Sequence, residues 1–402
     1  RKMYRPRLAN GQVVSLGWPM VIYRLFNIVS WPVEEHANKV FRIFVWFCYV
    51  LAFLVFIEHN DAELRYIRHE FQNMDQMLTC VPTYLILIET HIRGFYVGFL
   101  KAQFRKFLQN FYANIYVDKY SFPVQYKRIR YIMLPTLIYS SFYFLAVLSF
   151  LIVPILNLIY RRKDLVYKMI FPFDYTPLYI FLPVMFTNVW AGILVVTMEF
   201  GEANVFSEVI VNLTARYDIL RERFANRVGA LLQRKRCTDI SAEFEAELIE
   251  TIKQNVELNR FALRFQEEFS FRIFVQFAFS AAILCALGFK VYTNPVSSYG
   301  YIFWILAKIL EMLALGSLGS NLITMTDEIS SMYYNCNWEL VVERVSDAKK
   351  NVHLMKLIML AIATNQQPIS ITGLNFFSVS QLVVLKILQG AGSYFTCLIS
   401  LR

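Results

Sequence analysis

The stretch IMLPTLIYSSFYFLAVLSFLIVPILNLI, residues 132–159, holds no charged side chain. A helix of about 20 apolar residues crosses the roughly 30 Å hydrocarbon core of a bilayer, so this stretch is long enough to span a membrane. Six further apolar stretches lie at 41–57, 77–100, 178–200, 271–292, 301–324 and 376–400. We therefore predict an all-α membrane protein with seven transmembrane helices.

The composition of the whole chain points to the same class. Of its 402 residues, 57% are hydrophobic and only 17% are charged, whereas a soluble globular domain has about 25% charged residues. So much apolar surface cannot be hidden inside one water-soluble core, and a disordered chain would hold fewer apolar residues. The net charge of +10 does not indicate a nucleic-acid partner, because the basic residues lie beside the hydrophobic stretches.

The sequence holds no motif for catalysis or metal binding. Its six cysteines and five histidines are scattered without a metal-ligand spacing, so we expect no disulfide framework and no metal site. It contains no catalytic dyad, phosphate-binding loop or pair of nucleophile and base. We therefore expect neither an enzyme nor a cofactor.

The distribution of lysine and arginine predicts the orientation. The segments 1–40, 101–131, 201–270 and 325–375 together hold 27 of these residues, whereas the alternating segments 58–76, 160–177, 293–300 and 401–402 hold 7. Because basic residues concentrate on the cytoplasmic side, we predict a cytoplasmic N-terminus and an extracellular C-terminus. A G-protein-coupled receptor has the opposite orientation. The chain also lacks an Asp-Arg-Tyr after the third span and an Asn-Pro-x-x-Tyr in the seventh.

Two of the predicted cytoplasmic segments, 201–270 and 325–375, lack the glycine, proline and serine bias of linkers. We expect both to be helical and to pack against each other and against neighbouring subunits, with a helix lying on the membrane surface as the alternative. In the first segment one helical sector collects Phe244, Leu248, Ile249, Ile252, Val256 and Leu263. In the second, we expect Tyr333, Tyr334 and Trp338 to form an aromatic cluster, and residues 365–368 (Asn-Gln-Gln-Pro) to end a helix.

Two of the spans each carry a pair of oppositely charged residues. Glu89 and Arg93 are four residues apart, and Lys308 and Glu311 are three apart, so each pair shares one helix face. Pairing lowers the cost of burying a charge in a membrane. We predict that both pairs face the protein interior, with a role in ion conduction as the alternative.

The last span carries a stripe of small and weakly polar residues. Gly390, Ser393, Cys397, Ser400 and Leu401 share one sector of the helix with Lys386, and Phe395 and Ile399 lie opposite. Such a stripe is typical of close helix–helix packing or of a helix that lines water around a symmetry axis. The sequence alone leaves both interpretations open.

The chain resembles the insect odorant receptors over nearly its whole length. The resemblance depends on the order and spacing of several short motifs rather than on one. They are Phe171–Asp174, Glu267–Ser270 followed by Phe277, Ser280 and Cys285, Trp338 after Tyr333 and Tyr334, Asn365–Pro368, Thr372 and Gly373 with Phe376 and Phe377, Leu385 and Lys386, and Gly392–Thr396.

This resemblance implies a subunit of a ligand-gated, non-selective cation channel. Members of the family assemble as tetramers, in which odorant-specific subunits combine with a shared co-receptor in the dendritic plasma membrane of olfactory neurons. Segment 201–270 is too short for the long insertion of the co-receptor, which favours the odorant-binding subunit. By position, the pore residues are Ser393, Tyr394, Cys397, Ser400 and Leu401, with the constriction at Cys397.

The resemblance also divides the chain into functional segments. Residues 1–40 are cytoplasmic or interfacial, and 41–200 form spans one to four and the ligand-binding part. Residues 201–270 are cytoplasmic helices, 271–324 form spans five and six, 325–375 are a cytoplasmic anchor, and 376–402 form the pore helix.

The resemblance places a ligand pocket between spans two to six, in the outer half of the membrane. The faces expected to line it carry many aromatic rings and no fixed charge. Such a pocket suits a small neutral volatile ligand. A narrower hypothesis is that this ligand is aromatic or heteroaromatic. Ordinary helix packing is the alternative for each residue. The residues are Cys80, Val81, Tyr84, Tyr139, Phe142, Tyr143, Ala146, Phe150, Phe181, Val184, Met185, Asn188, Tyr301 and Trp304.

Two other functions are compatible with seven spans. One is a gustatory-type channel of the same superfamily. The other is a membrane transporter, although the sequence shows no matching breaks in two halves, which are common in transporters.

Overall fold

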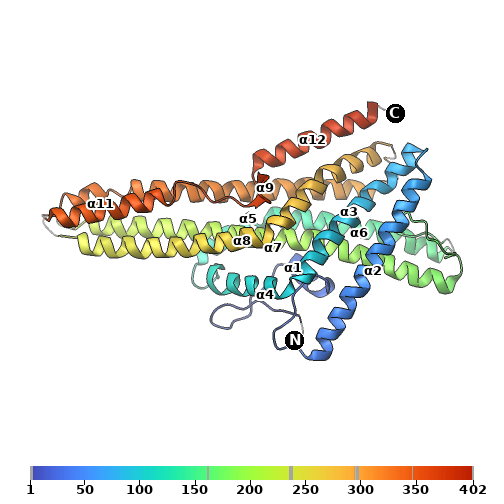
Figure 1. The fold of residues 1–402 in the computed structure, drawn as a ribbon, viewed down its shortest axis with the longest axis horizontal. Helices are drawn as coiled ribbons and strands as arrows, with labels where there is room; N and C mark the ends of the chain where they lie inside the picture. The colour runs from blue at the N-terminus through green and yellow to red at the C-terminus, as the bar shows by residue number, and fades with distance from the viewer. Residues whose placement is uncertain are drawn as a thin grey trace.

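The computed structural model describes residues 3–160, 163–234, 239–293, 295, 298–345 and 347–400. This part of the chain is mostly helical, and Figure 1 shows an elongated molecule. Its helices are α1 (Trp18–Phe26), α2 (Lys39–His69), α3 (Met74–Phe99), α4 (Lys101–Asn110), the π-helical turn η1 (Phe111–Ile115), α5 (Pro123–Ile132), α6 (Leu134–Ile159), α7 (Leu178–Leu232), α8 (Ser241–Thr293), α9 (Tyr299–Tyr334), α10 (Trp338–Val342), α11 (Ala348–Ala363) and α12 (Gln381–Ser400).

Each predicted span corresponds to one helix, namely α2, α3, α6, α7, α8, α9 and α12 in chain order. Within the described residues, five helical segments are apolar and long enough to cross a membrane: Lys39–His69, Pro123–Ile159, Leu178–Leu232, Ser241–Thr293 and Tyr299–Val342. Helices α3 and α12 are not among these five. The fold is that of an all-α membrane protein, and the count of seven spans stays a prediction.

The seventh predicted span begins too early. Residues 376–380 do not belong to a helix. Instead, Phe377 and Ser378 form strand β2, which pairs antiparallel with β1 (Thr372–Gly373). Leu374 and Asn375 adopt φ angles of 47° and 61°, and two successive left-handed residues reverse the chain tightly. Helix α12 therefore begins at Gln381. Hydropathy missed the hairpin, because Phe376 and Phe377 are as apolar as the helix that follows.

Helices α7 and α8 are far longer than a membrane is thick. The 55 residues of α7 rise roughly 80 Å at 1.5 Å per residue, and α8 has 53 residues. Figure 1 shows that their far ends run beside α9 and α11 in one long arm. Aromatic rings fill the space between them, such as Phe206 against Phe265 with centroids 5.1 Å apart. Helix α8 runs without a break from segment 201–270 into the fifth predicted span.

Two details of the expected cytoplasmic packing are wrong within this single chain. Phe244 and Leu248 are buried as expected, but Val256 and Leu263 are 39% and 63% exposed, because Leu258 and Phe265 carry the buried face further along α8. Likewise, Tyr334 is exposed whereas Tyr333 is buried, so the three aromatic residues do not form one cluster. Helix α11 ends at Ala363, just before residues 365–368, as predicted.

Helices α11 and α12 mark opposite ends of the elongated molecule (Figure 1). Figure 1 shows the C-terminal end of α12 near the α2–α3 turn, at the opposite end from α11. Helix α12 packs against α8 and α9. The glycines of α9 permit this close approach, since a Cβ atom at Gly319 would lie 2.0 Å from the carbonyl oxygen of Val379.

Candidate ligand-binding site

A small cavity lies between α3, α6, α7 and α9. Its volume is about 50 Å³, and most of its lining is apolar. It is lined by Thr83, Ile86, Tyr143, Ala146, Val147, Phe150, Leu151, Val166, Tyr167, Gly192, Val195, Val196, Glu199 and Trp304.

Helix α6 supplies one continuous side of this cavity. Tyr143, Ala146, Val147 and Phe150 recur at intervals of three and four residues, so they share one helix face. The ring of Phe150 meets that of Tyr301 edge to face, with centroids 4.9 Å apart. Such ring pairs stabilise a packing arrangement beyond their buried area, so the aromatic side of the cavity is preorganised.

The segment 163–177, here called the covering segment, closes the cavity on the side of the α2–α3 turn. Val166 and Tyr167 line the cavity. The backbone N–H of Tyr167 donates to Oδ1 of Asn188 at 3.2 Å, and Cys80 Sγ donates to the carbonyl oxygen of Lys168 at 3.5 Å. At Gly192, a Cβ atom would lie 2.8 Å from the Tyr167 hydroxyl, so glycine leaves room for this tyrosine.

Four of the fourteen residues expected to line a pocket do line this cavity: Tyr143, Ala146, Phe150 and Trp304. Others have structural roles nearby. Cys80 and Asn188 hold the covering segment, as described above, and Tyr301 stacks on Trp304 with centroids 6.4 Å apart. The remaining seven do not line the cavity: Val81, Tyr84, Tyr139, Phe142, Phe181, Val184 and Met185.

On α7 the cavity lies on the same helix face as the expected residues, but further along the helix axis. The expected residues were 181, 184, 185 and 188, whereas the cavity is lined by residues 192, 195, 196 and 199. Each observed position is eleven residues further along, which is about three helical turns. Periodicity indicates the angular face of a helix but carries no information on how far along its axis a partner lies.

The floor of the cavity is charged, which the sequence analysis did not expect. Glu199 lines the cavity, although we predicted that no buried fixed charge would be there. Its Oε2 atom lies 2.8 Å from Nζ of Lys308, and its Oε1 atom lies 3.1 Å from Nη1 of Arg93. The carboxylate is therefore present but already paired with two cations.

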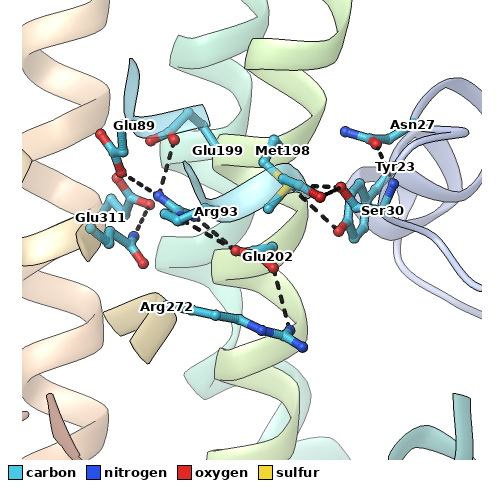
Figure 2. Close-up of polar contacts among 12 residues, drawn as sticks. Tyr23, Asn27, Ser30, Glu89, Arg93, Met198, Glu199, Glu202, Arg272 and Glu311 are labelled. Carbon is cyan, nitrogen blue, oxygen red and sulfur yellow. Dashed lines mark hydrogen bonds and ion pairs between the residues drawn. The ribbon is translucent and has the colours of Figure 1, made fainter. Parts of the chain in front are cut away.

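Glu199 belongs to a buried ionic cluster that joins four helices. We define it as Glu89 and Arg93 of α3, Glu199 and Glu202 of α7, Glu268 and Arg272 of α8, and Lys308 and Glu311 of α9. Figure 2 shows Arg93 among the carboxylates of Glu89, Glu199 and Glu202, with Arg272 on the other side of Glu202. The predicted pairing of Glu89 with Arg93 and of Lys308 with Glu311 in the protein interior is confirmed.

The sequence analysis missed the residues that join these two pairs. Glu202 and Glu268 lie outside the predicted spans, and Glu199 lies at the end of one. A local rule recognises partners three or four residues apart, but the Arg93–Glu202 contact joins residues more than a hundred positions apart. The sequence offers one signal for these contacts, because Glu199, Glu202 and Glu268 are acidic residues at or near the ends of predicted spans.

A hydrogen bond connects the side of the cavity to this cluster. The Tyr143 hydroxyl donates to Oε2 of Glu311 at 2.6 Å, and Nε2 of Gln276 donates to Oε1 of the same residue at 2.7 Å. Gln276 belongs to α8, which packs along α12. Three turns further along α8, a Cβ atom on Gly288 would lie 3.2 Å from the ring of Phe395. A series of direct contacts therefore joins Tyr143 to α8, the helix that packs against α12.

Helix α12 turns its small polar stripe away from its own chain. Ser393, Tyr394, Cys397 and Ser400 are exposed, whereas Phe395 and Ile399 are partly buried. Leu401, the fifth predicted pore residue, lies outside the described residues. The stripe is thus free to meet water, lipid or another chain. Within the described ranges, no three histidine, cysteine, aspartate or glutamate side chains are placed to hold a metal ion.

Comparisons with known proteins agree on one family. The family model described as 7tm Odorant receptor matches residues 73–392. The chain is 44% identical to Odorant receptor 74a of Drosophila melanogaster over 399 residues, which cover 99% of each chain. It is 41% identical to Odorant receptor 35a of the same species over 401 residues, which cover 99% of this chain and 98% of that one.

The fold is also similar to a solved structure. The olfactory receptor OR5 of Machilis hrabei matches with a TM-score of 0.74 over 96% of this chain and 97% of that chain, at 14% identity. The same receptor in complex with eugenol matches with a TM-score of 0.73 over the same shares of both chains.

Proposed function

The chain belongs to the insect odorant receptor family as a tuning receptor rather than the co-receptor, and from this membership we propose that it is the odorant-binding subunit of a ligand-gated cation channel. The observation that carries the proposal is the cavity beside α6, whose Tyr143 is bonded to the ionic cluster. A ligand site and a path towards the candidate pore helix are what such a subunit needs. We propose no enzymatic activity.

The ligand class follows from the lining of the cavity. Apolar and aromatic side chains dominate it, and its one carboxylate is already paired with Lys308 and Arg93. We therefore propose a small neutral volatile, with aromatic and heteroaromatic compounds among the first to test. The complex of OR5 of Machilis hrabei with eugenol supports the search for a small aromatic ligand.

The mechanism we propose is a shift between two conformations. A volume of about 50 Å³ is too small for an aromatic ring, since a cavity of about 150 Å³ is known to hold benzene. The ligand therefore binds a conformation in which the cavity is larger, and it stabilises that conformation by its differential affinity. The contacts from Tyr143 through Glu311 and Gln276 would pass the change to α8 and on to α12.

We propose that α12 lines the pore where several chains meet. Its exposed residues Ser393, Cys397 and Ser400 would face water, and Tyr394 would support the helix. The assembly would be a tetramer with the co-receptor in the dendritic plasma membrane of olfactory neurons. The proposed topology has seven spans, a cytoplasmic N-terminus and an extracellular C-terminus. Residues 1–40, 201–270 and 325–375 would then be cytoplasmic, and residues 41–200, 271–324 and 376–402 would form the membrane part.

Current recordings test the proposal directly. Three sets of cells are compared: one expresses this chain together with the co-receptor, one expresses this chain alone, and one expresses the co-receptor alone. Each set is exposed to the same panel of neutral volatiles. We expect a cation current that needs this chain. In Phe150→Ala, which enlarges the cavity, we expect changed odorant sensitivity, whereas Phe186→Ala, at an exposed position of α7, should leave it unchanged. Absence of current in every pairing, with the chain at the cell surface, would refute the channel function.

A further inference from the structure

A buried carboxyl group without a hydrogen-bond partner lies near the cavity. Glu63, towards the end of α2, is fully buried, and within the described part of the chain neither of its carboxyl oxygens has a hydrogen-bond partner. Leaving a buried polar group unpaired costs free energy, and a carboxyl group is among the most costly. The Glu63 carboxyl group therefore lacks a hydrogen-bond donor among the described residues.

Two side chains beside the Glu63 carboxyl group make hydrogen bonds to backbone carbonyl groups. The hydroxyl of Thr83 and the thiol of Cys80 both lie beside the Glu63 carboxyl group. Thr83 Oγ1, however, donates to the carbonyl oxygen of Cys80 at 2.8 Å, and Cys80 Sγ donates to the carbonyl oxygen of Lys168 at 3.5 Å. Each of these groups has a single hydrogen to donate, so either one could donate to Glu63 only by giving up the hydrogen bond that it already makes.

Thr83 connects Glu63 with the cavity. It lines the cavity on one side and lies beside the Glu63 carboxyl group on the other. A ligand must enlarge the cavity of about 50 Å³, and the threonine side chain has two accessible χ1 rotamers in a helix. A change of rotamer at Thr83 would release its bond to Cys80 and open the cavity towards Glu63.

We propose that Glu63 and Thr83 form a polar subsite of the cavity that binds the hydroxyl group of an alcohol or phenol. This inference rests on the proposed function, because it names the ligand class of the same site. A hydroxyl group donates one hydrogen bond and accepts others, so it can donate to a Glu63 oxygen and accept from Thr83. An ether only accepts and would leave Glu63 unpaired. An ammonium group has three hydrogens to place, which the apolar lining cannot satisfy.

Matched ligand pairs test the subsite. Alcohols, their methyl ethers and the corresponding primary amines are compared on benzyl, phenethyl, cyclohexyl and hexyl skeletons, in cells that express the chain with the co-receptor. We expect each alcohol to act at a concentration about tenfold or more below that of its ether, because a site that binds a hydroxyl group rejects the analogue without one. In Glu63→Leu this ratio should fall towards one, through loss of alcohol sensitivity alone.

Two controls separate the inference from the proposed function. The first control is Glu58→Leu, at an exposed position of the same helix, which should keep the wild-type ratio of ether to alcohol concentrations. The second is the ether response of Glu63→Leu, which should be unchanged and thereby report correct folding. Thermal stabilisation of the purified chain by the same ligands measures binding without current. Binding that shows the alcohol preference without any current would refute the channel function and retain the subsite. Equal affinity for alcohol and ether, preference for the amine, or an unchanged ratio in Glu63→Leu would refute the subsite.

Discussion

Arg93 shows how one side chain can hold a membrane-embedded core together. Its guanidinium group contacts Glu89 on its own helix and Glu199 and Glu202 on α7. The planar group presents five N–H donors, so it can serve several carboxylates at once. Lysine offers only a point charge and could not reproduce these contacts. The residue therefore determines how α3 and α7 fit together beneath the cavity.

Arg93→Met should destabilise the protein severely. The substitution leaves three carboxylates without their shared cation, and removal of one partner from a buried ion pair costs about 3–5 kcal/mol. We expect loss of the chain from the cell surface and a lower melting temperature in detergent. The matched control is Arg65→Met, which removes an exposed pair with Asp61 and should cost about 0–1 kcal/mol. Equal stability of the two variants would contradict a structural role for the cluster.

The single residue is also the scale at which the sequence predicts least. The local pairs of Glu89 with Arg93 and of Lys308 with Glu311 follow from spacing alone. Their union into one cluster depends on Glu199 and Glu202 arriving from another helix, and a single sequence contains no record of that contact. The same limit applies to Glu63, because only the fold reveals that Thr83 and Cys80 are engaged elsewhere.

At the scale of the element, helix faces were predictable and their axial positions were not. On α7 the expected and observed lining residues share one face but differ by eleven positions. On α12 the exposed stripe and the partly buried Phe395 and Ile399 lie as the helical wheel predicts. The covering segment was not predicted to line the cavity at all, because a loop has no periodicity from which its contacts could be inferred.

Gly192→Ala should disturb the covering segment without harming α7 itself. The new methyl group would lie 2.8 Å from the Tyr167 hydroxyl, so the tyrosine must move away from the cavity side. We expect changed odorant sensitivity and faster proteolysis of segment 163–177. Gly229→Ala is the control, because nothing lies within 4 Å of its Cβ position. That variant should gain about 1 kcal/mol of helix stability and respond as wild type. A normal odorant response in Gly192→Ala would show that Tyr167 does not shape the site.

A second element, the part of α7 beyond the predicted span, gives a pH dependence. Burial raises the pKa of Glu208 to about 7, against smaller opposing effects of the Tyr112 hydroxyl and Arg130. The Tyr112 hydroxyl donates to Oε2 of Glu208 at 3.3 Å. Because this pKa exceeds the usual 4.5, the folded state favours the protonated acid. Protonated Glu208 therefore contributes fully to the free energy of unfolding below about pH 4.5, and this contribution is lost as pH rises through 7.

Glu208→Gln should therefore reduce this pH dependence. Between pH 5 and 8 the wild-type free energy of unfolding should fall by at most about 3 kcal/mol from this group, and the variant should lack that part of the fall. Melting temperatures in detergent across this range measure the difference. Glu222→Gln on the same helix, at an exposed position, is the control and should keep the wild-type slope. A steeper slope in Glu208→Gln would refute the assigned sign.

At the scale of the whole molecule, hydropathy found the helices but not their ends. Every predicted span corresponds to a helix, because a long apolar segment in a membrane can satisfy its backbone hydrogen bonds in few other ways. The start of the last span was wrong, since the β1–β2 hairpin is as apolar as α12. The long arm of α7, α8, α9 and α11 seen in Figure 1 was expected to be helical. The exposure of Val256 and Leu263 in it is consistent with contacts to further chains.

The role of α12 depends on the assembly, and Cys397 gives a direct way to test it. The thiol is exposed in the single chain, so it is either wetted by a pore or covered by a neighbouring chain or lipid. If α12 lines water, a charged thiol reagent applied outside should reduce the odorant-evoked current, because the attached group blocks a narrow path. Cys397→Ser should abolish the effect and thereby exclude the other cysteines. In that background, Ile399→Cys, on the side of α12 that faces its own chain, should react slowly. Equal reaction at both positions would show a helix without a water-facing side, and no reaction at Cys397 would favour close packing over pore lining.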